Sequence, residues 1–312
     1  METTKTTKHF EFTGETKKIG KGITLHRIRA KDKTIHAKIG DIGGWVEKLD
    51  NLCDNAWVSD NACVWGNACV CGNACVCGNA YVYDNAWVSD NAIVCGDARV
   101  YGYTHVSDNA HVSGNAHVYD YAFVHGNAHV SDNACVYGEA EVYGEACVSD
   151  NAFVYGDAWV YEEAWVSGTA CVWGQACVYG EACVSDNAEV YGRAFISGNA
   201  CVYDNAYVCG TARVCGKAWV CGEVYVCGKV SISGNARVSS NDDHCGFDGL
   251  GSDNIDTYAY RTTKGVEITG YDFRGSIDEF ATKIKETYCG REYEKQYDLI
   301  IKLIKLKFNL PD

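Results

Sequence analysis

The chain of 312 residues has almost no proline and no long apolar run. Its single proline is Pro311, so repeated turns in the body of the chain must be made by Gly, Asn and Asp. No apolar run approaches the roughly 18 residues that a membrane-spanning helix needs. The opening residues METTKTTKHF lack the apolar segment of a signal peptide. We therefore expect a cytoplasmic protein that does not bind or cross a membrane.

Basic residues are also scarce in the middle of the chain. Residues 45–240 contain 7 Lys and Arg against 22 Asp and Glu, a net charge of −15, and the whole chain carries −14. Binding to a nucleic-acid backbone needs a basic stripe or patch, which this segment lacks. We expect no nucleic-acid partner, and the acidity favours solubility.

A six-residue repeat dominates what is present. An aliphatic residue, almost always valine, recurs at every sixth position from Val58 to Val238, which gives 31 hexads without insertion or deletion. Val46 and Leu52 extend the same register toward the N-terminus. The consensus unit is Asn-Ala-x-Val-x-(Gly/Asp), and a period of this kind indicates a repeat architecture.

Each hexad predicts one short strand and one corner. In Ala-x-Val-x the alternation has the period of a strand, so Ala and Val face one way and the two variable residues face the other. The following Gly or Asp, usually with Asn, tolerates positive φ and can bond its own backbone. A valine period of six does not produce one face of a helix, so a helical repeat is excluded.

Strands this short, without the spacing of hairpins, can pair only as successive coils of a parallel solenoid. The unit resembles the hexapeptide repeat of the left-handed, triangular-prism β-helices known from bacterial hexapeptide-repeat transferases. The resemblance implies an all-β solenoid with three hexads in each 18-residue coil and about ten to eleven coils. It also implies left-handed winding, against the usual right-handed crossover. Stacked Val and Ala would fill the inside and leave no internal ligand cavity.

In such a solenoid, residues 18 apart stack in columns on the outside. One column, formed by the residue after each valine on one face, is aromatic in eight successive coils. It comprises Trp65, Tyr83, Tyr101, Tyr119, Tyr137, Tyr155, Trp173 and Tyr191. Three interpretations stay open: a ladder that stabilises the sheet, a buried oligomer interface, or a stacking platform for a sugar, a base or a partner protein. This aromatic column is our candidate binding site.

Histidines suggest a metal site. His105, His111 and His117 are six residues apart, so they point from three different faces and cannot share an ion within one chain. His111 and His129 are 18 apart in one column, with Cys147 above them. They are weak candidates for a zinc site completed by another subunit, and coincidental stacking is the alternative.

Cysteines are abundant, with 19 in the chain, and a reducing compartment favours their use as small apolar side chains. The stretch NACVCGNACVCGNA, residues 67–80, contains two Cys-x-Cys pairs that a corner separates. A four-thiolate site within one chain is therefore excluded. We expect Cys71 to stack on Cys53 and Cys77 beneath Cys95. Parallel Cβ vectors disfavour a disulfide in such pairs, so we expect reduced, outward thiols.

The ends of the chain differ from the repeat and predict three domains: a β cap at 1–44, the repeat at 45–240 and an α+β module at 241–312. The cap would hold a few strands that lead into the first coil. Open coil edges recruit other strands, so we expect both end domains to cover them.

The C-terminal module is predicted as a hairpin followed by two helices. Residues 241–254 form a polar, glycine-rich break, and DTYAYRTTKGVEITGYDF then predicts a hairpin with Lys264 and Gly265 at its turn. Ser276 and Glu279 form a capping box that opens a helix over IDEFATKIKETY. EYEKQYDLIIKLIKLKF predicts a second, amphipathic helix. Three leucines lie on one side of it, Leu299, Leu303 and Leu306.

The repeat resembles the superfamily of trimeric hexapeptide-repeat acyltransferases and γ-class carbonic anhydrases. Those enzymes interrupt the coils with a loop that carries a catalytic or metal-binding His, and their active sites lie between subunits. No loop interrupts residues 58–238 here, so no catalytic role carries over to any residue. The resemblance implies a homo-oligomer, most often a trimer.

Two further segments resemble a narrower group. GITLHRIRAKDK and KIGDIGGWVEKLDNLCDNAWV are similar to the entry segment of the YdcK-like proteins of enterobacteria and prophages, which are labelled putative transferases. GLGSDNIDTYAYRTTKGVEITGYDFRGSIDEFATKIKETY resembles a tail module of phage hexapeptide proteins. The resemblance implies a phage or prophage protein in the cytoplasm of a bacterial host.

These observations favour a non-enzymatic, oligomeric scaffold or binding protein without a cofactor. Its functional surface would be the aromatic column or the C-terminal module, and its partner a protein, such as a host-defence component, or a small ligand, such as a nucleotide signal. The competing function class is an acyltransferase or a γ-carbonic-anhydrase-like metalloenzyme with an intersubunit site near His111 and His129.

Overall fold

The structure is a computed structural model that describes residues 8–20, 22–251, 255–270 and 273–311. It divides into two compact units after Gln175. Some predicted features lie outside the described residues. These are residues 1–7 and 312 of the end domains, residues 252–254 of the glycine-rich break, and Tyr271 and Asp272 of the hairpin stretch.

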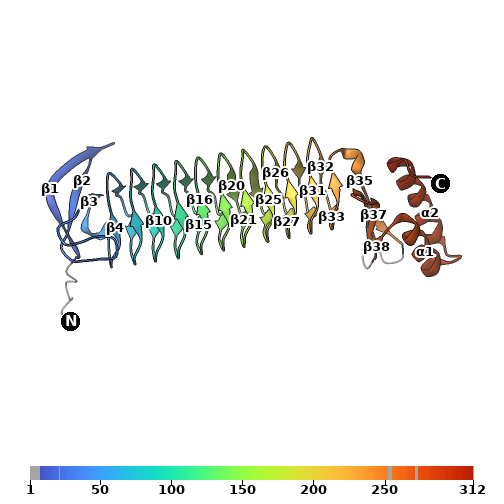
Figure 1. Cartoon of the computed structure of the whole chain (residues 1–312), viewed down its shortest axis with the longest axis horizontal. Coiled ribbons are helices and arrows are strands. Elements are labelled where there is room, and N and C mark those ends of the chain that lie inside the picture. Colours follow the sequence, from blue (N-terminus) through green and yellow to red (C-terminus); the bar gives the residue numbers. More distant parts are fainter. Residues whose placement is uncertain (1–7, 21, 252–254, 271–272, 312) are drawn as a thin grey trace. The chain divides into compact units, whose positions relative to one another are not determined.

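The first unit begins with an antiparallel cap, as predicted. Strand β1 (Phe10–Ile19) pairs with β2 (Ile23–Ala30), and β2 pairs with β3 (Ile42–Val46). Strand β3 also pairs in parallel with β5 (Cys63–Val64), so that Val46 lies beside Val64. The cap therefore continues directly into the coils (Figure 1). A short 3-10 helix, η1 (Leu49–Asn51), follows β3.

Three parallel sheets form the coils of the first unit. Each strand pairs with the equivalent strands of the coils before and after it. Val112, for example, pairs with Val94 and Val130. Sheet A continues from β3 through β5 to β8 (Tyr81–Val82), β11 (Arg99–Val100), β14 (His117–Val118), β17 (Cys135–Val136), β20 (Phe153–Gly156) and β23 (Cys171–Gly174). Sheet B contains β6 (Cys69–Val70), β9 (Trp87–Val88), β12 (His105–Val106), β15 (Phe123–Val124), β18 (Glu141–Val142) and β21 (Trp159–Val160). Sheet C contains β4 (Trp57–Val58), β7 (Cys75–Val76), β10 (Ile93–Val94), β13 (His111–Val112), β16 (His129–Val130), β19 (Cys147–Val148) and β22 (Trp165–Val166).

The second unit begins with the same type of coil. Its strands are β24 (Cys177–Val178), β25 (Cys183–Val184), β26 (Glu189–Val190), β27 (Phe195–Ile196), β28 (Cys201–Val202), β29 (Tyr207–Val208), β30 (Arg213–Val214), β31 (Trp219–Val220), β32 (Tyr225–Val226), β33 (Ser231–Ile232) and β34 (Arg237–Val238). The pairing again joins equivalent strands of successive coils, as between Val184 and Val202. The predicted parallel β-solenoid is confirmed.

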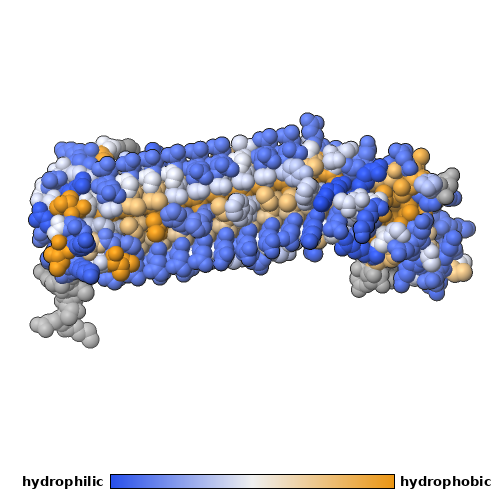
Figure 2. Space-filling model, viewed as in Figure 1, coloured by the Kyte–Doolittle hydropathy of each residue, from blue (hydrophilic) through white to orange (hydrophobic). Residues whose placement is uncertain are grey.

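The predicted roles of the hexad residues, with Ala and Val facing inward and Gly or Asp at the corner, are confirmed. The Ala and Val of the hexads are buried inside the coils. Asp and Gly adopt positive φ at the corners, as at Asp60 (φ 55°) and Gly66 (φ 70°). Corner side chains also bond between coils: the Gly72 amide donates to Asp54 Oδ2 at 3.0 Å. Figure 2 shows polar residues along the coil corners, with an apolar band between them.

The C-terminal module contains more strand than the sequence predicted. After η2 (Asn241–Asp243), a four-stranded antiparallel sheet runs in the order β35 (His244–Leu250), β36 (Ile255–Thr262), β37 (Gly265–Gly270) and β38 (Phe273–Gly275). The predicted polar break is therefore wrong over β35, where Cys245 and Phe247 pack against the module's core. The hairpin is confirmed, but Thr262 pairs with Gly265, which moves the turn to residues 263–264.

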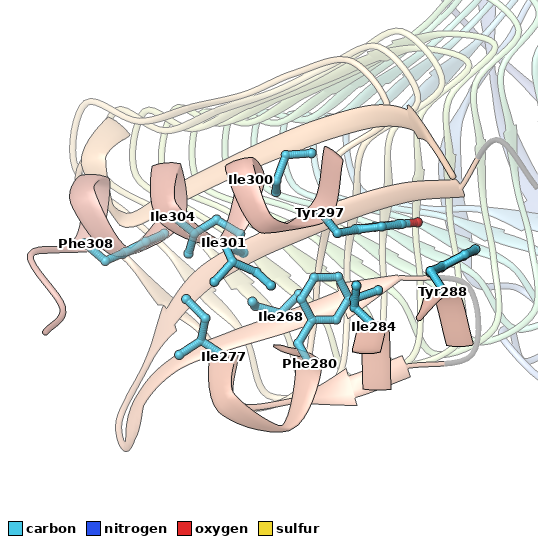
Figure 3. Packing of buried hydrophobic residues seen from close by; sticks show 11 residues of the cluster. Ile268, Ile277, Phe280, Ile284, Tyr288, Tyr297, Ile300, Ile301, Ile304 and Phe308 are labelled. Atoms are coloured by element: carbon cyan, nitrogen blue, oxygen red, sulfur yellow. The ribbon is translucent and has the colours of Figure 1, made fainter. Parts of the chain in front are cut away.

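Helix α1 (Ile277–Tyr288) and helix α2 (Glu292–Phe308) have the predicted bounds, and the capping box of Ser276 and Glu279 is present. The buried face of α2 is not the leucine face: Ile300, Ile301 and Ile304 point into the core, as Figure 3 shows. The three leucines do share one side, but it is exposed, at 62% for Leu299, 53% for Leu303 and 75% for Leu306.

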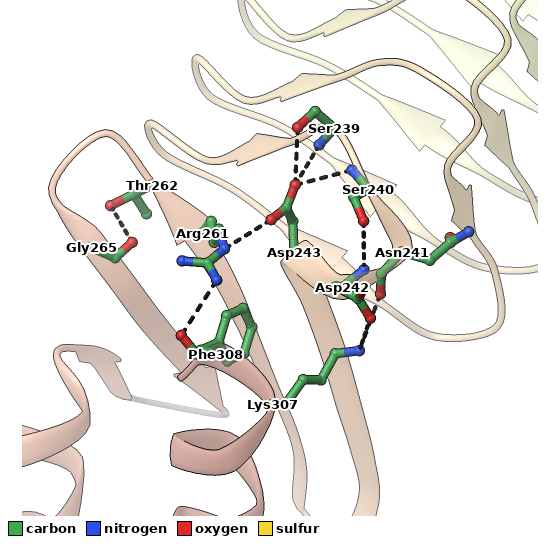
Figure 4. A network of polar contacts seen from close by, with 10 residues as sticks. All are labelled: Ser239, Ser240, Asn241, Asp242, Asp243, Arg261, Thr262, Gly265, Lys307 and Phe308. Carbon is green, nitrogen blue, oxygen red and sulfur yellow. Dashed lines mark hydrogen bonds and ion pairs between the residues drawn. The ribbon is translucent and has the colours of Figure 1, made fainter. Parts of the chain in front are cut away.

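A polar network joins the last coil to the module within the second unit (Figure 4). The carboxylate of Asp243 accepts from the Ser239 amide at 2.9 Å and the Ser240 amide at 3.0 Å, and Arg261 Nε lies 2.8 Å from its other oxygen. Lys307 of α2 donates to the carbonyl of Asn241 at 3.2 Å. These bonds hold η2 against both β36 and α2.

Candidate functional site

The predicted aromatic column exists as a stack on sheet A of the first unit. Each ring lies nearly parallel to the next, with interplanar angles of at most 4°. The centroid distances are 4.5 Å for Trp65–Tyr83, 4.8 Å for Tyr83–Tyr101, 5.1 Å for Tyr101–Tyr119, 4.8 Å for Tyr119–Tyr137, 4.9 Å for Tyr137–Tyr155 and 5.9 Å for Tyr155–Trp173. The parallel register of the strands imposes this spacing.

The stacked rings partly bury one another. All seven residues from Trp65 to Trp173 are half-buried. Burial, as the main cause, raises the pKa of Tyr83, Tyr101, Tyr119 and Tyr137 above its ordinary value, so these phenols stay uncharged at neutral pH. The column therefore presents a continuous aromatic strip whose rings are partly exposed.

The eighth predicted residue, Tyr191, follows β26 in the second unit. Two cysteines continue its column in that unit, and here one expectation is wrong: Cys209 and Cys227 form a disulfide, with their Cα atoms 4.6 Å apart. Stacking in register places the two Cα atoms within disulfide range, and the side chains rotate to meet. The cysteines of the two pairs expected to be reduced, Cys53 with Cys71 and Cys77 with Cys95, are free thiols.

A second set of aromatic residues is more exposed and is not among the predicted site residues. It lies on sheet B, at the position before each valine. Its exposed members are Trp87 (43%), Phe123 (43%) and Trp159 (45%), with His105 between the first two. His105 stacks on Phe123 at 5.1 Å and an interplanar angle of 20°. The sequence signal for this set is the same 18-residue spacing at the position before valine.

The aromatic column ends, toward the cap, in a groove of about 360 Å³. Ile19, Gly20 and Ile23 at the end of the β1–β2 hairpin form one wall. The opposite wall is formed by Trp65, Tyr81, Tyr83 and Arg99. Gly20 has φ +44°, the left-handed conformation that glycine tolerates in a hairpin turn. The groove thus includes two residues of the predicted site and adds the hairpin, whose position no local pattern revealed.

Among its described lining residues, the groove combines aromatic surface with one positive charge. Trp65 stacks on Tyr83 and meets the edge of Tyr81 at 5.6 Å and 76°. The Arg99 guanidinium lies 5.8 Å from the Tyr81 ring centroid. Aromatic and aliphatic walls accept a flat ring, and a guanidinium pairs with carboxylate or phosphate. The arrangement suits the binding of a flat ring that carries a negative charge.

The histidine pair lies where predicted, on adjacent strands β13 and β16. The rings of His111 and His129 are 5.5 Å apart, and His111 Nε2 lies 3.4 Å from Cys95 Sγ. Burial first, then the neighbouring His129, lowers the pKa of His111. Cys147 pairs in register with His129. Among the residues that the structure describes, the one group of three metal-ligating side chains with ligand atoms within 4.8 Å contains none of these. A zinc site completed by a second subunit stays a prediction.

The four cysteines of residues 67–80 separate as predicted, since Cys69 belongs to sheet B and Cys75 to sheet C. Cys71 is not an exposed thiol, however; it is buried, with 8% of its surface accessible. The coils run from Trp57 to Val238, a range that the structure describes in full, with a strand in every hexad. The interrupting loop of the hexapeptide enzymes is absent from that range.

Sequence comparison agrees with the geometry of the coils. Residues 194–210 match a family described as YdcK Beta solenoid repeat. No curated protein matches the chain with significant similarity. No helix of the described residues, α1 and α2 included, combines the length and apolar character needed to span a membrane.

Proposed function

We propose that the protein is a non-enzymatic binding scaffold that holds a flat, negatively charged ring compound in the groove beside Trp65 and Tyr83. A nucleotide is the ligand class with both properties, since its base stacks and its phosphate pairs with a guanidinium. The coils would serve as a rigid support for the aromatic wall, and the cap hairpin would form the opposite wall.

One observation carries this proposal: a groove lined by three aromatic rings, two isoleucines and Arg99. Stacking on an aromatic side chain contributes about 1–3 kcal/mol per base. A charge-assisted hydrogen bond contributes about 1.5–3 kcal/mol. Together these contributions correspond to modest affinity, typical of a ligand that binds and leaves rapidly.

The test is a calorimetric titration of the full chain with adenosine monophosphate, and with adenosine and ribose 5-phosphate as its two halves. We expect the nucleotide to bind and each half to bind more weakly. Arg99→Gln should weaken nucleotide binding about tenfold and leave adenosine binding unchanged, because only the phosphate contact is lost. Trp65→Ser should weaken the binding of the nucleotide and of adenosine alike, because Trp65 is the terminal ring of the column, whereas both faces of Tyr83 are covered by Trp65 and Tyr101.

The matched control is Arg213→Gln. The Arg213 guanidinium also stacks on an aromatic ring, 5.4 Å from Phe195, but Arg213 does not line the groove. This variant should bind the nucleotide as the wild type does. Absence of binding by all three probes, or equal affinity in the wild type and Arg99→Gln, would overturn the proposal.

The exposed aromatic residues of sheet B favour a second candidate function, a homo-oligomeric scaffold. Trp87, Phe123 and Trp159 present side chains that a protein interface would bury. The wild type should then have a native mass that is a multiple of 34.1 kDa. The double variant Phe123→Ser, Trp159→Ser should shift it to the monomer, whereas Tyr119→Phe should not. A monomeric wild type would exclude this candidate.

A further inference from the structure

Three cysteines of the first unit form a compact cluster that the groove does not use. Cys53 Sγ lies 3.5 Å from Cys69 Sγ, and the sulfurs of Cys53, Cys69 and Cys71 all lie within 4.8 Å of one another. Among the residues that the structure describes, no other three metal-ligating side chains meet that criterion. Cys71 is buried and the other two are half-buried, so the cluster is partly shielded from solvent.

The coil geometry explains why these three residues meet. A residue after one valine contacts the equivalent residue of the next coil, in its own column. It also contacts the residue 16 positions further along the chain, which directly precedes the valine of that next coil. The same diagonal contact joins Cys95 to His111 and His125 to Glu141. From Cys53 both steps end on cysteine, at Cys69 and Cys71, and the three thiols form a triangle.

The backbone holds the cluster in place. Leu52 forms a parallel bridge with Val70, and the Cys53 amide donates to the Val70 carbonyl at 3.0 Å. The Lys8 ammonium donates to the Leu52 carbonyl at 3.0 Å, which places a positive charge beside the sulfurs. The Lys8 charge opposes, without reversing, the rise in the pKa of Cys53, whose main cause is burial, and of Cys69, whose main cause is the Cys71 thiol. A bound metal ion therefore has to displace the thiol protons.

We infer that Cys53, Cys69 and Cys71 form a binding site for a soft metal ion, either Zn²⁺ with a water molecule in the fourth position or Cu⁺ in trigonal coordination. Zinc–sulfur bonds of about 2.3 Å place ligand sulfurs roughly 3.8 Å apart in a tetrahedral site. The three sulfurs therefore need only small rotations to reach one ion. Soft thiolates select Cu⁺ and Zn²⁺ over hard cations. Each thiol that binds the ion releases one proton to solvent, and no electron is transferred.

The experiment uses the full chain, reduced and freed of metal. Zn²⁺ is titrated in competition with a chromophoric chelator, Cu⁺ is titrated in a separate anaerobic experiment, and native mass spectrometry counts the bound ions. We expect one tightly bound ion per chain from at least one of the two metals. Cys69→Ser should lower the affinity at least about 100-fold.

Two further variants separate this cluster from the other free thiols. Cys135→Ser removes a cysteine at the equivalent position before a valine, whose register partners are His117 and Phe153, and should leave binding unchanged. Cys77 and Cys95 stack in successive coils, but the position that corresponds to Cys69 in this pair is occupied by Ile93. Ile93→Cys should therefore complete a second triangle and add a second tightly bound ion.

A measurement on the wild type guards against a folding defect in the variants. One equivalent of the bound metal should protect the half-buried Cys53 and Cys69 from alkylation, as peptide mapping reports, and leave Cys135 reactive. Absence of a tightly bound ion of either metal would overturn the inference. So would equal affinity in Cys69→Ser and Cys135→Ser, or protection of a different set of cysteines.

Discussion

The coils and the C-terminal module bury their apolar residues by different means. In the coils, Ala and Val occupy the same inward positions in nearly every hexad, and the strands pair in the same register from one coil to the next. In the module, one cluster of unlike residues from β36, β37, α1 and α2 forms the core. A repeated local pattern defines its own interior, whereas a single cluster depends on which elements meet.

The difference is clearest on helix α2. Its sequence offers two apolar sides, one with Leu299, Leu303 and Leu306 and one with Ile300, Ile301 and Ile304. Packing against α1 and the sheet buries the isoleucines and leaves the leucines exposed. No equivalent choice exists in a hexad, because the outward positions vary while the inward ones do not.

The largest expected effect tests which side of α2 is the core. Ile304 is fully buried, and Ile304→Ala should lower the free energy of unfolding by about 2–5 kcal/mol because it leaves a cavity. Leu303→Ala, one residue away on the exposed side, should change it by less than about 0.5 kcal/mol. Urea denaturation followed by circular dichroism measures both. Equal losses would show that the leucine side is also buried in the protein in solution.

The next effect tests whether the outside of the coils contributes to their stability. Tyr119 stacks on Tyr101 and Tyr137, and an aromatic pair contributes about 0.5–1.5 kcal/mol beyond its buried area. Tyr119→Ser should therefore lower the free energy of unfolding by about 1–3 kcal/mol. Tyr119→Phe keeps the ring and serves as the control. If thermal or urea denaturation gives the same free energy of unfolding for both variants, the stack does not stabilise the coils.

A smaller effect concerns the one polar side chain at an inward position of the repeat in the first unit's described coils. Thr104 occupies an alanine position and is fully buried, and its hydroxyl has no hydrogen-bond partner. Thr104→Val keeps the shape and removes the unpaired hydroxyl, so it should raise the free energy of unfolding by about 1 kcal/mol. Valine already occupies the equivalent position at Val224. Thr104→Ser retains the hydroxyl and loses a methyl group, and it should be destabilising; a gain in stability from Ser would contradict this account.

The smallest effect is a pH dependence of the module. Burial, followed by the charge of Lys307, lowers the pKa of His244 below its usual 6.5, and its Nδ1 is buried without a partner. The folded state therefore favours the neutral ring. The contribution of His244 to stability is fully present above pH 6.5 and is lost as the pH falls through the lowered value.

The measurement is the urea midpoint at pH 7.5 and at pH 5.5 for the wild type and for His244→Gln. The wild type should lose more stability on acidification than the variant, because glutamine does not titrate. An identical pH dependence in both proteins would mean that other groups are responsible.

The sequence was sufficient for the coils because their register depends on near neighbours. A period of six with alternating Ala and Val specifies strand, corner and facing in every unit, and the stacking of successive coils then brings Trp65 next to Tyr83. The bounds of α1 and α2 were also predictable, because capping and helical periodicity are local signals.

Other features depended on contacts between distant segments. The hairpin wall of the groove lies next to Trp65 only because β3 pairs with both β2 and β5. Strand β35 was missed because its weak apolar alternation becomes a strand by pairing with β36. The contact of Cys53 with Cys69 follows from the lateral offset of side chains on adjacent strands, which the columns of stacked residues alone do not reveal.

By itself, the sequence determined the parallel coils, their inward Ala and Val, their Gly and Asp corners, and the aromatic column on sheet A. These features repeat, so each unit is constrained by the same local chemistry and by identical neighbours. Only the tertiary structure decided the groove beneath the cap hairpin, the buried side of α2 and the triangle of Cys53, Cys69 and Cys71. Each of these arises where unlike segments meet once, and the outcome depends on which packing buries the most apolar surface and leaves the fewest polar groups unpaired.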